Sequence, residues 1–298
     1  MQTCVNEERK RKWGDRKDGY LVDQLDAMHT FVPFLLPNRA DNEAVLNTKI
    51  DLTAVEEYLA KKNKDNPEFK YTFFHVICAA LAKAIAMRPK LNRFYSGYRL
   101  YDRKEISFSF VVKKKLVDDG DEVLAIVKID KDSDVPPVEQ IYSQVKKIVY
   151  SARKQGKDDG ATNTIAILNH LPRIMLKMVM GILKWMDYHG LYPKAFMAVD
   201  PYFSTVFISN LGSIKMDANY HHLANWGTNS FFVTIGEKKP SPFFKEDGSY
   251  EMRTTLDLGL TIDERIADGV YYANSVKLLK EILNNPEILD EPICTPLE

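Results

Sequence analysis

Runs rich in β-branched and aromatic residues alternate along the chain with runs that have a helical period. The first kind predicts strands at 44–51, 122–130, 204–212, 230–239 and 251–264. The second kind predicts helices at 52–64, 71–89, 136–156 and 268–283. Thr72 is a candidate N-cap, and Pro89 and Gly156 are candidate stops. Two β-rich runs within 97–115, joined by a polar turn, predict a hairpin.

The order of these elements lacks the strict β-α rhythm of a doubly wound sheet. The predicted fold class is therefore α/β, with a mixed β-sheet and helices packed on it. Residues 1–40 form a basic, then apolar, N-terminal arm, in which Pro33 and Pro37 oppose regular structure. Residues 41–298 form the remaining domain, with a loop expected at 156–163.

Two further segments carry less regular patterns. The Met-rich segment 172–189 is apolar but interrupted by charges, so a membrane span is not expected. It predicts an amphipathic helix that packs on the core, with a groove for an acyl chain or a partner as the alternative. The segment 237–251, with its prolines and an Asp-Gly pair, predicts a hairpin turn.

Composition narrows the function classes. Lys and Arg together number 41, as do Asp and Glu, so the formal net charge is zero, which argues against a nucleic-acid partner. Hydrophobic residues make up 45% and charged residues 28%, a profile typical of globular domains. The charged N-terminus has no apolar run typical of a secretory signal, so a cytoplasmic location is expected.

Several common site motifs are absent from the sequence. There is no GxGxxG after a strand, no GxxxxGK[ST], no HExxH and no GxSxG. The adjacent pair His221 and His222 cannot face one way on a strand, so no metal site is expected from it. Cys78 lies in an apolar helical run, where a buried and inert thiol is expected.

The C-terminal third carries the pattern that points to chemistry. "STVFISNLGSI" (204–214), "FFVTIGEKK" (231–239) and "TLDLGLTIDERIADGVYYANSVKLLKEILNNPEIL" (255–289) occur in that order. With "FFHVICAALAKAIAMRPKLN" (73–92) and "RLYDRKEISFSFVV" (99–112), they resemble the catalytic domain of the dihydrolipoyl acyltransferases of 2-oxo acid dehydrogenase complexes. The resemblance covers roughly residues 40–290. It implies the two-layer sandwich fold that this family shares with chloramphenicol acetyltransferase.

The family signature is Asp-His-Arg-x-x-Asp-Gly, in which the histidine is the general base. In this chain the signature reads Asp263, Glu264, Arg265, Ile266, Ala267, Asp268 and Gly269. Glu264 therefore stands where the family has its catalytic histidine. A glutamate can act as a base at neutral pH where burial raises its pKa. The alternative is that Glu264 pairs with Arg265 or another cation and does no chemistry.

The resemblance also implies roles for the residues around Glu264. Ser209, followed by Asn210, matches the serine whose hydroxyl donates to the oxyanion of the tetrahedral intermediate. Asp268 matches the second aspartate, which supports the architecture of the site together with Asp263 and Arg265. Gly269 is expected to allow close backbone packing at the turn.

The alternative source of a base is an imidazole from elsewhere in the chain. His221 or His222 would supply it, although hydrogen-bonded loop or core histidines are the plainer interpretation. In the resembling family, trimers assemble their sites at subunit interfaces, so a homotrimer is expected here.

The resemblance implies CoA or acyl-CoA as co-substrate, with no metal and no lipoyl attachment in this chain. The leading hypothesis is a free-standing acyltransferase that moves an acyl group from acyl-CoA to a hydroxyl, amine or thiol of a small molecule. One alternative is an inactive scaffold or binding protein that kept the fold. The other is an acyl-CoA thioesterase, in which Glu264 directs water onto the thioester.

Overall fold

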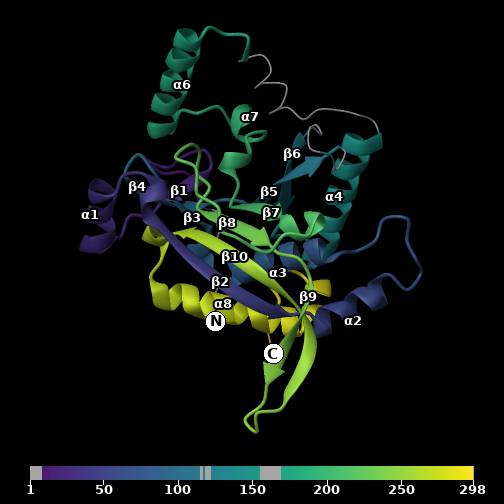
Figure 1. Ribbon diagram of the computed structural model, residues 1–298. Coiled ribbons are helices and arrows are strands. Elements are labelled where there is room, and N and C mark those ends of the chain that lie inside the picture. Colours follow the sequence, from purple (N-terminus) through teal and green to yellow (C-terminus); the bar gives the residue numbers. More distant parts are fainter. Residues whose placement is uncertain (1–8, 115–116, 118–121, 155–168, 298) are drawn as a thin grey trace.

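The computed structural model describes residues 9–114, 117, 122–154 and 169–297. The loop expected at 156–163 and the first eight residues of the arm lie outside the described residues. In the described chain a large mixed sheet has the strand order β2-β10-β8-β7-β5-β6, and β9 pairs with the far part of β10 (Figure 1). Its strands are β2 (Glu43–Asp51), β5 (Ile106–Lys113), β6 (Glu122–Ile129), β7 (Val206–Asn210), β8 (Phe231–Ile235), β9 (Lys239–Phe244) and β10 (Tyr250–Asp263).

Helices cover one face of this sheet, which confirms the predicted α/β fold with a mixed sheet (Figure 1). They are α2 (Thr53–Lys62), α3 (Phe73–Met87), α4 (Pro137–Lys154) and α8 (Gly269–Asn284). Short 3₁₀ turns connect the elements: η1 (Arg39–Asn42), η2 (Pro89–Asn92), η3 (Pro201–Phe203), η4 (Leu211–Ile214), η5 (Glu264–Ile266) and η6 (Pro286–Asp290). Helix α3 lies at the centre of the core and is buried along almost its whole length.

Helix α3 begins where the sequence indicates, at the N-cap Thr72. The Thr72 hydroxyl and backbone N–H both approach His75 Nδ1, at 2.9 and 3.0 Å, so that histidine fills the position of the usual Glu or Gln in a capping box. Burial lowers the pKa of His75 to about 4 and raises that of the Cys78 thiol. The prediction of an inert thiol agrees with this environment.

The hairpin predicted at 97–115 is wrong. Its two runs form β4 (Arg99–Arg103) and β5, which belong to different sheets. Strand β4 lies between β1 (Gly19–Leu21) and β3 (Arg93–Ser96) in a separate three-stranded sheet, while β5 pairs with β6 and, in parallel, with β7. Because β5 is buried on both faces, it needs partners in the main sheet, and the polar turn only passes the chain from one sheet to the other.

The arm contains regular structure that Pro33 and Pro37 were expected to prevent. Besides β1, residues Ala27–Leu35 form helix α1, with Pro33 inside it. A proline cannot donate to the carbonyl four residues earlier, here that of His29. That carbonyl accepts a hydrogen bond from the Tyr95 hydroxyl at 2.8 Å instead, and this contact compensates for the missing donor.

Two other segments also differ from expectation. The Met-rich segment forms helix α6 (Arg173–Tyr188), but none of its residues is buried, so the prediction of core packing is wrong. The segment predicted as a hairpin turn contains β9 before the turn, and a short helix, α7 (Lys194–Met197), follows α6. No helix in the described ranges is both long and apolar enough to cross a membrane.

Candidate functional site

The turn that follows β10 carries the Asp-Glu-Arg part of the signature, and two of its side chains are buried. The Asp263 carboxylate has no exposed surface and accepts two hydrogen bonds from the Arg265 guanidinium, at 2.8 Å from Nε and 2.7 Å from Nη2. It also accepts one from the Arg265 backbone N–H at 3.3 Å. The Asp263 carbonyl accepts from the Tyr272 hydroxyl at 2.8 Å. These contacts fix the shape of η5 and its position against α8.

A second buried cation approaches the same carboxylate. Arg39 Nε lies 3.7 Å from Asp263 Oδ2, and the other nitrogens of Arg39 donate to the carbonyls of Tyr95, Ala224 and Gly227 at 2.8–3.2 Å. Burial lowers the pKa of Arg39, and the charge of Asp263 opposes that effect. One carboxylate thus compensates two buried guanidinium groups, which the sequence pattern alone did not reveal.

Glu264 projects from this rigid turn into solvent. It is exposed, and Arg265 pairs with Asp263 rather than with Glu264. The alternative in which Glu264 is held by Arg265 is therefore wrong. Within the part of the chain that the structure describes, no hydrogen bond or ion pair holds the Glu264 carboxylate. A single copy of the chain therefore leaves this group free for a ligand or for another copy.

Asp268 and Gly269 mark the start of α8. The Asp268 carboxylate accepts from the Tyr271 backbone N–H at 2.8 Å and is the N-cap of the helix, and this hydrogen bond lowers its pKa. A Cβ added to Gly269 would meet no atom within 4 Å. The expectation that Gly269 permits close packing is therefore wrong for the single chain, because open space lies beside it.

Ser209 lies near the end of β7, on the sheet face opposite the main helix layer. Its neighbours on that face are Phe207, Phe232 and Thr234, whereas the alternate residues of both strands point into the main core. The Ser209 residue is half-buried, and the following Asn210 is exposed. A hydroxyl at this position is therefore accessible from the side of the sheet that the main helix layer does not cover.

The strand register separates Ser209 from Glu264. Ser209 pairs with Thr234 on β8, and Thr234 pairs with Gly259 on β10, five residues before Glu264. Two strand spacings across the sheet and five residues along it amount to about 19 Å. The two residues thus lie toward opposite ends of the sheet, and one copy of the chain does not bring them together.

The loop between β7 and β8 passes back over the sheet near Ser209. The Thr234 hydroxyl donates to the Asn219 carbonyl, and a Cβ on Gly259 would collide with both of these groups, so only glycine fits there. Gly259 was not among the site residues predicted from the sequence, although a glycine within an otherwise β-rich run is a usual signal of close backbone approach.

This loop places His221 on the same sheet face as Ser209. The His221 ring stacks on Phe232 with a centroid separation of 4.1 Å, and on His222 at 4.5 Å. By strand spacing, the Cα atoms of Phe232 and Ser209 are about 8 Å apart. His221 Nδ1 contacts the His222 carbonyl at 3.0 Å, and both histidines are exposed. The structure thus places His221 much closer to Ser209 than Glu264 is.

A cavity of about 300 Å³ lies beside η5. Its lining combines cationic and aromatic side chains from the arm, the β3–β4 turn, α6 and the β7–β8 loop. These include Arg39, Tyr95, Tyr98, Lys184, Trp226 and Arg265. Of these residues, only Arg265 was predicted from the sequence to belong to the site, because the segments that meet here are far apart in the chain.

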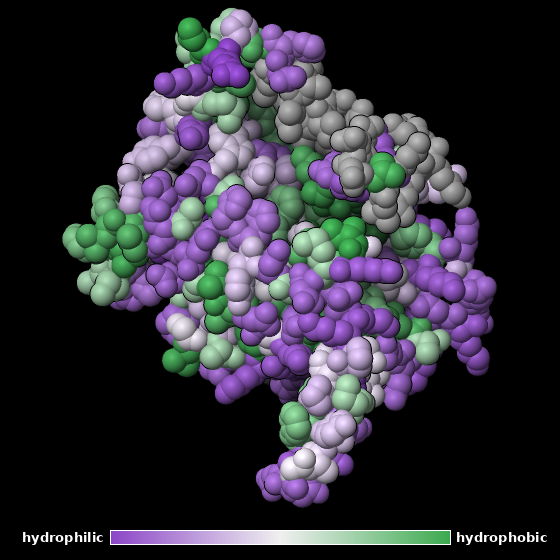
Figure 2. Space-filling view, in the orientation of Figure 1, coloured by the Kyte–Doolittle hydropathy of each residue, from purple (hydrophilic) through white to green (hydrophobic). Residues whose placement is uncertain are grey.

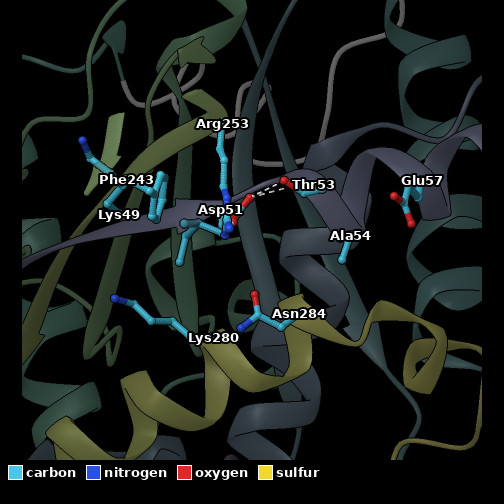
Figure 3. A pocket seen from close by; sticks show the side chains of 10 residues that line it. Lys49, Asp51, Thr53, Ala54, Glu57, Phe243, Arg253, Lys280 and Asn284 are labelled. Carbon is cyan, nitrogen blue, oxygen red and sulfur yellow. Dashed lines mark hydrogen bonds and ion pairs between the residues drawn. The ribbon is translucent and has the colours of Figure 1, made fainter. Parts of the chain in front are cut away.

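A larger cavity, of about 500 Å³, lies at the other end of β10 (Figure 3). It is open, and Lys49, Asp51 and Phe243 line it together with Lys280 and Asn284 of α8. None of the predicted site residues borders it, so its size does not make it the reaction site. Among the described residues, no group of three or more His, Cys, Asp or Glu side chains could hold a metal ion.

Comparison with known proteins supports the resemblance. Residues 200–289 match the family of 2-oxoacid dehydrogenases acyltransferase (catalytic domain). A search of curated proteins found no match.

Solved structures share the fold across nearly the whole chain. A probable dihydrolipoamide acetyltransferase from Listeria monocytogenes has 14% identity and a TM-score of 0.57, with 94% of this chain and 99% of that chain covered. The Azotobacter vinelandii dihydrolipoamide acetyltransferase, in which roles of a serine, a histidine and an asparagine in the catalytic mechanism were investigated, has 16% identity and a TM-score of 0.57, with coverage of 90% and 93%.

A chloramphenicol acetyltransferase has 13% identity and a TM-score of 0.51, with 89% of this chain and 99% of that chain covered. The resemblance inferred from the motifs is thereby confirmed. The chain has the chloramphenicol acetyltransferase-like acyltransferase fold, and its segment 200–289 is similar in sequence to the catalytic domain of the 2-oxoacid dehydrogenase acyltransferases.

Proposed function

We propose that this protein is a CoA-dependent acyltransferase whose reaction site forms between two copies of the chain. Glu264 of one copy is the general base, and Ser209 of the next copy is the oxyanion donor. The observation that carries the proposal is the separation of about 19 Å between these two residues within one chain. Both residues of the matched motifs are accessible, yet only a second copy can bring them to one reacting group.

The chemistry follows from these roles. Glu264 removes the proton from an acceptor thiol, hydroxyl or amine, which attacks the thioester carbonyl of acyl-CoA. The Ser209 hydroxyl donates to the oxyanion of the tetrahedral intermediate. The intermediate then collapses, the carbon–sulfur bond breaks, and the CoA sulfur takes up the proton. A base works best with a pKa near the working pH, so the facing copy must also desolvate Glu264.

An apolar surface beside η5 supports a contact between copies. Helix α1 packs against η5, and the Arg265 guanidinium donates to the Leu36 carbonyl at 3.1 Å. Four residues of α1 are exposed and apolar: Met28, Phe31, Phe34 and Leu35. They form the apolar area at the left edge of the molecule in Figure 2. Exposed clusters of this kind are typical of interaction surfaces. We infer that the copies form a homotrimer. We further infer that the protein is cytoplasmic and that its acceptor is a soluble small molecule.

The position of His221 supports a second assignment of the base. Because His221 and Ser209 lie on one sheet face of the same chain, an imidazole is available there without a second copy. In that case Glu264 would take no part in proton transfer. The two assignments differ in whether the site belongs to one chain or to two, and this difference can be measured.

The deciding experiment mixes two inactive variants. Glu264→Gln and Ser209→Ala are each expected to abolish transfer from acetyl-CoA to a panel of thiols, amines and alcohols. Co-expressed in equal amounts, they form assemblies in which one interface in four pairs an intact glutamate with an intact serine, so about a quarter of wild-type activity returns. No recovery on mixing contradicts a shared site. Full activity of Glu264→Gln, with loss in His221→Gln but not in His222→Gln, assigns the base to His221.

Calorimetric titration with CoA and acetyl-CoA distinguishes the remaining alternatives. Saturable binding at micromolar ligand supports the acyltransferase. Absence of binding at millimolar ligand supports a scaffold that kept the fold without the activity. Release of CoA thiol in the absence of any acceptor, abolished in Glu264→Gln, supports the thioesterase.

A further inference from the structure

Helix α6 stands away from the body of the molecule with an apolar surface on its outer side. In Figure 1 it lies at the top, beyond the main sheet and its helix layer. Its C-terminal end is anchored, because Asp187 Oδ1 accepts from Arg16 Nη2 at 2.7 Å and the Asp187 carbonyl accepts from Arg16 Nη1. No residue of the helix is buried. The outer apolar surface therefore belongs to a helix whose C-terminal end is fixed to the rest of the chain.

Four apolar side chains form a stripe along the outer side. Ile174, Met178, Ile182 and Trp185 follow one another at spacings of four, four and three residues, which places them on one helical face. Their exposed fractions are 78, 62, 57 and 57%. Gly181, whose missing side chain opens the surface, completes a shallow apolar hollow of about 320 Å³ with the last three. A single exposed apolar side chain is ordinary on a protein surface, whereas a continuous apolar stripe along one helix is typical of an interaction surface.

Three cations run parallel to this stripe. Arg173, Lys177 and Lys184 are all exposed and lie within an arc of about 40° on the helix. Within the described ranges none of them has an acidic partner. The acidic residue of the helix, Asp187, is held by Arg16. The exposed surface of α6 is therefore apolar along one line and positive along a second line, about 115° away around the helix. Lys184, at the C-terminal end of the positive line, also borders the cavity beside η5. Figure 2 shows both kinds of surface at the top of the molecule.

We propose that α6 binds an anionic lipid surface. In this arrangement the helix lies flat in the interface, the stripe enters the acyl region, and the three cations contact anionic headgroups. A basic amphipathic helix with a tryptophan on its apolar side has the chemistry of such binding. With 16 residues and charges along its length, α6 is suited to lie on a bilayer rather than to cross it.

Charge selects this occupant over a second copy of the chain. The formal net charge of the protein is zero, so another copy brings no general attraction to a row of cations. An anionic bilayer offers both an apolar interior and a dense layer of negative charge, which match the two lines of α6. The proposal is independent of the acyl transfer discussed above, and its test measures binding alone.

The test is sedimentation of the purified full chain with sucrose-loaded vesicles. Vesicles of phosphatidylcholine with roughly one third phosphatidylglycerol are compared with vesicles of phosphatidylcholine alone. Binding is expected to the anionic vesicles and to weaken as salt rises. Lys177→Glu with Lys184→Glu should weaken it at least about tenfold. Ile182→Ser with Trp185→Ser should abolish it.

The matched control is Lys245→Glu with Lys277→Glu, which makes the same change in net charge at two exposed lysines outside α6. This control should bind vesicles like the wild type. Absence of binding to anionic vesicles by the wild-type protein overturns the proposal, as does equal weakening in the control. A third outcome also overturns the proposal: the wild type binds no vesicles, and the Ile182→Ser, Trp185→Ser variant has a changed oligomer mass. That outcome assigns the stripe to a contact between copies.

Discussion

Replacing Asp263 by asparagine should be among the most destabilising conservative changes in this protein. The change keeps the size of the side chain and removes its charge. Asp263 has no exposed surface, and it compensates the guanidinium groups of Arg265 and Arg39, whose side chains are 3% and 6% exposed. After the change, two neighbouring cations remain buried without a counter-charge.

The expected magnitude follows from that burial. Removing one partner of a buried ion pair costs about 3–5 kcal/mol, because the remaining charge keeps its desolvation penalty. The geometry places Asp263→Asn at the upper part of this range, since the carboxylate accepts both Nε and Nη2 of Arg265 and also lies 3.7 Å from Arg39. Such a loss is a large share of the roughly 5–15 kcal/mol that stabilises a typical domain.

The assay is urea unfolding, followed by circular dichroism at one fixed protein concentration, since association changes apparent stability. The matched control is Glu251→Gln on the same strand. Glu251 also accepts from an arginine, Arg253, at 3.0 Å, but both side chains are substantially exposed, so little stability should be lost. The two variants differ mainly in the burial of the pair they break.

A second variant tests the cause. Adding Arg265→Met to Asp263→Asn removes one of the two uncompensated cations and should restore part of the lost free energy of unfolding. Two outcomes would contradict this reasoning. In one, Asp263→Asn loses no more stability than Glu251→Gln. In the other, Arg265→Met costs as much stability in the Asp263→Asn background as it does alone, so that removing the unpaired charge brings no recovery.

Three further predictions concern His75, Asp268 and Lys83. Burial lowers the pKa of His75 from its ordinary 6.5 to about 4, so at pH values between these two the unfolded chain binds a proton that the folded chain does not. The neutral, buried histidine therefore makes its full contribution to the free energy of unfolding above pH 6.5. Up to about 3 kcal/mol of that free energy is lost as pH falls toward 4. His75→Gln keeps a capping-box residue and should remove this part of the pH dependence, as measured by urea unfolding at several pH values. Asp268→Ala should lower the melting temperature by roughly 2–4 °C, whereas Asp268→Asn, which can still cap α8, should not; equal effects would contradict the N-cap role. Lys83 is fully buried, and its hydrogen-bond partners among the described residues are two backbone carbonyls at 3.4 Å. Because burial of this charge costs free energy, Lys83→Met should raise stability by about 1 kcal/mol in the same unfolding assay, and a loss of stability would contradict this reasoning.

Local patterns in the sequence were sufficient to predict much of the main sheet and its helix layer. Helix α3 begins at the predicted Thr72, α8 begins after the predicted Asp268, and β10 nearly coincides with the predicted strand 251–264. Helix caps and hydrophobic periods depend on residues that are close in the sequence, so they are the same in the folded chain as in the prediction. The order of motifs in the C-terminal third also pointed to the acyltransferase fold that the comparisons confirm.

The sequence misled wherever the outcome depended on partners far along the chain. The β4 and β5 runs read as a hairpin, but each finds its partners in a different sheet. Pro33 was expected to prevent a helix, yet a distant Tyr95 hydroxyl satisfies the carbonyl that the proline leaves without a donor. The apolar face of α6 predicted core packing, but hydrophobic periodicity cannot tell whether a face meets the core or solvent.

The candidate site divides in the same way. The sequence by itself determined which side chains are present: a glutamate in the histidine position of the signature, a serine near the end of a buried strand, and an aspartate able to cap the last helix. Only the tertiary structure decided how far apart they lie, because the register of β7, β8 and β10 sets the separation of Ser209 and Glu264. It also decided that Arg265 binds Asp263 and leaves Glu264 exposed. Distances and charge pairing are properties of the folded chain, since strand order and burial join residues that no local pattern connects.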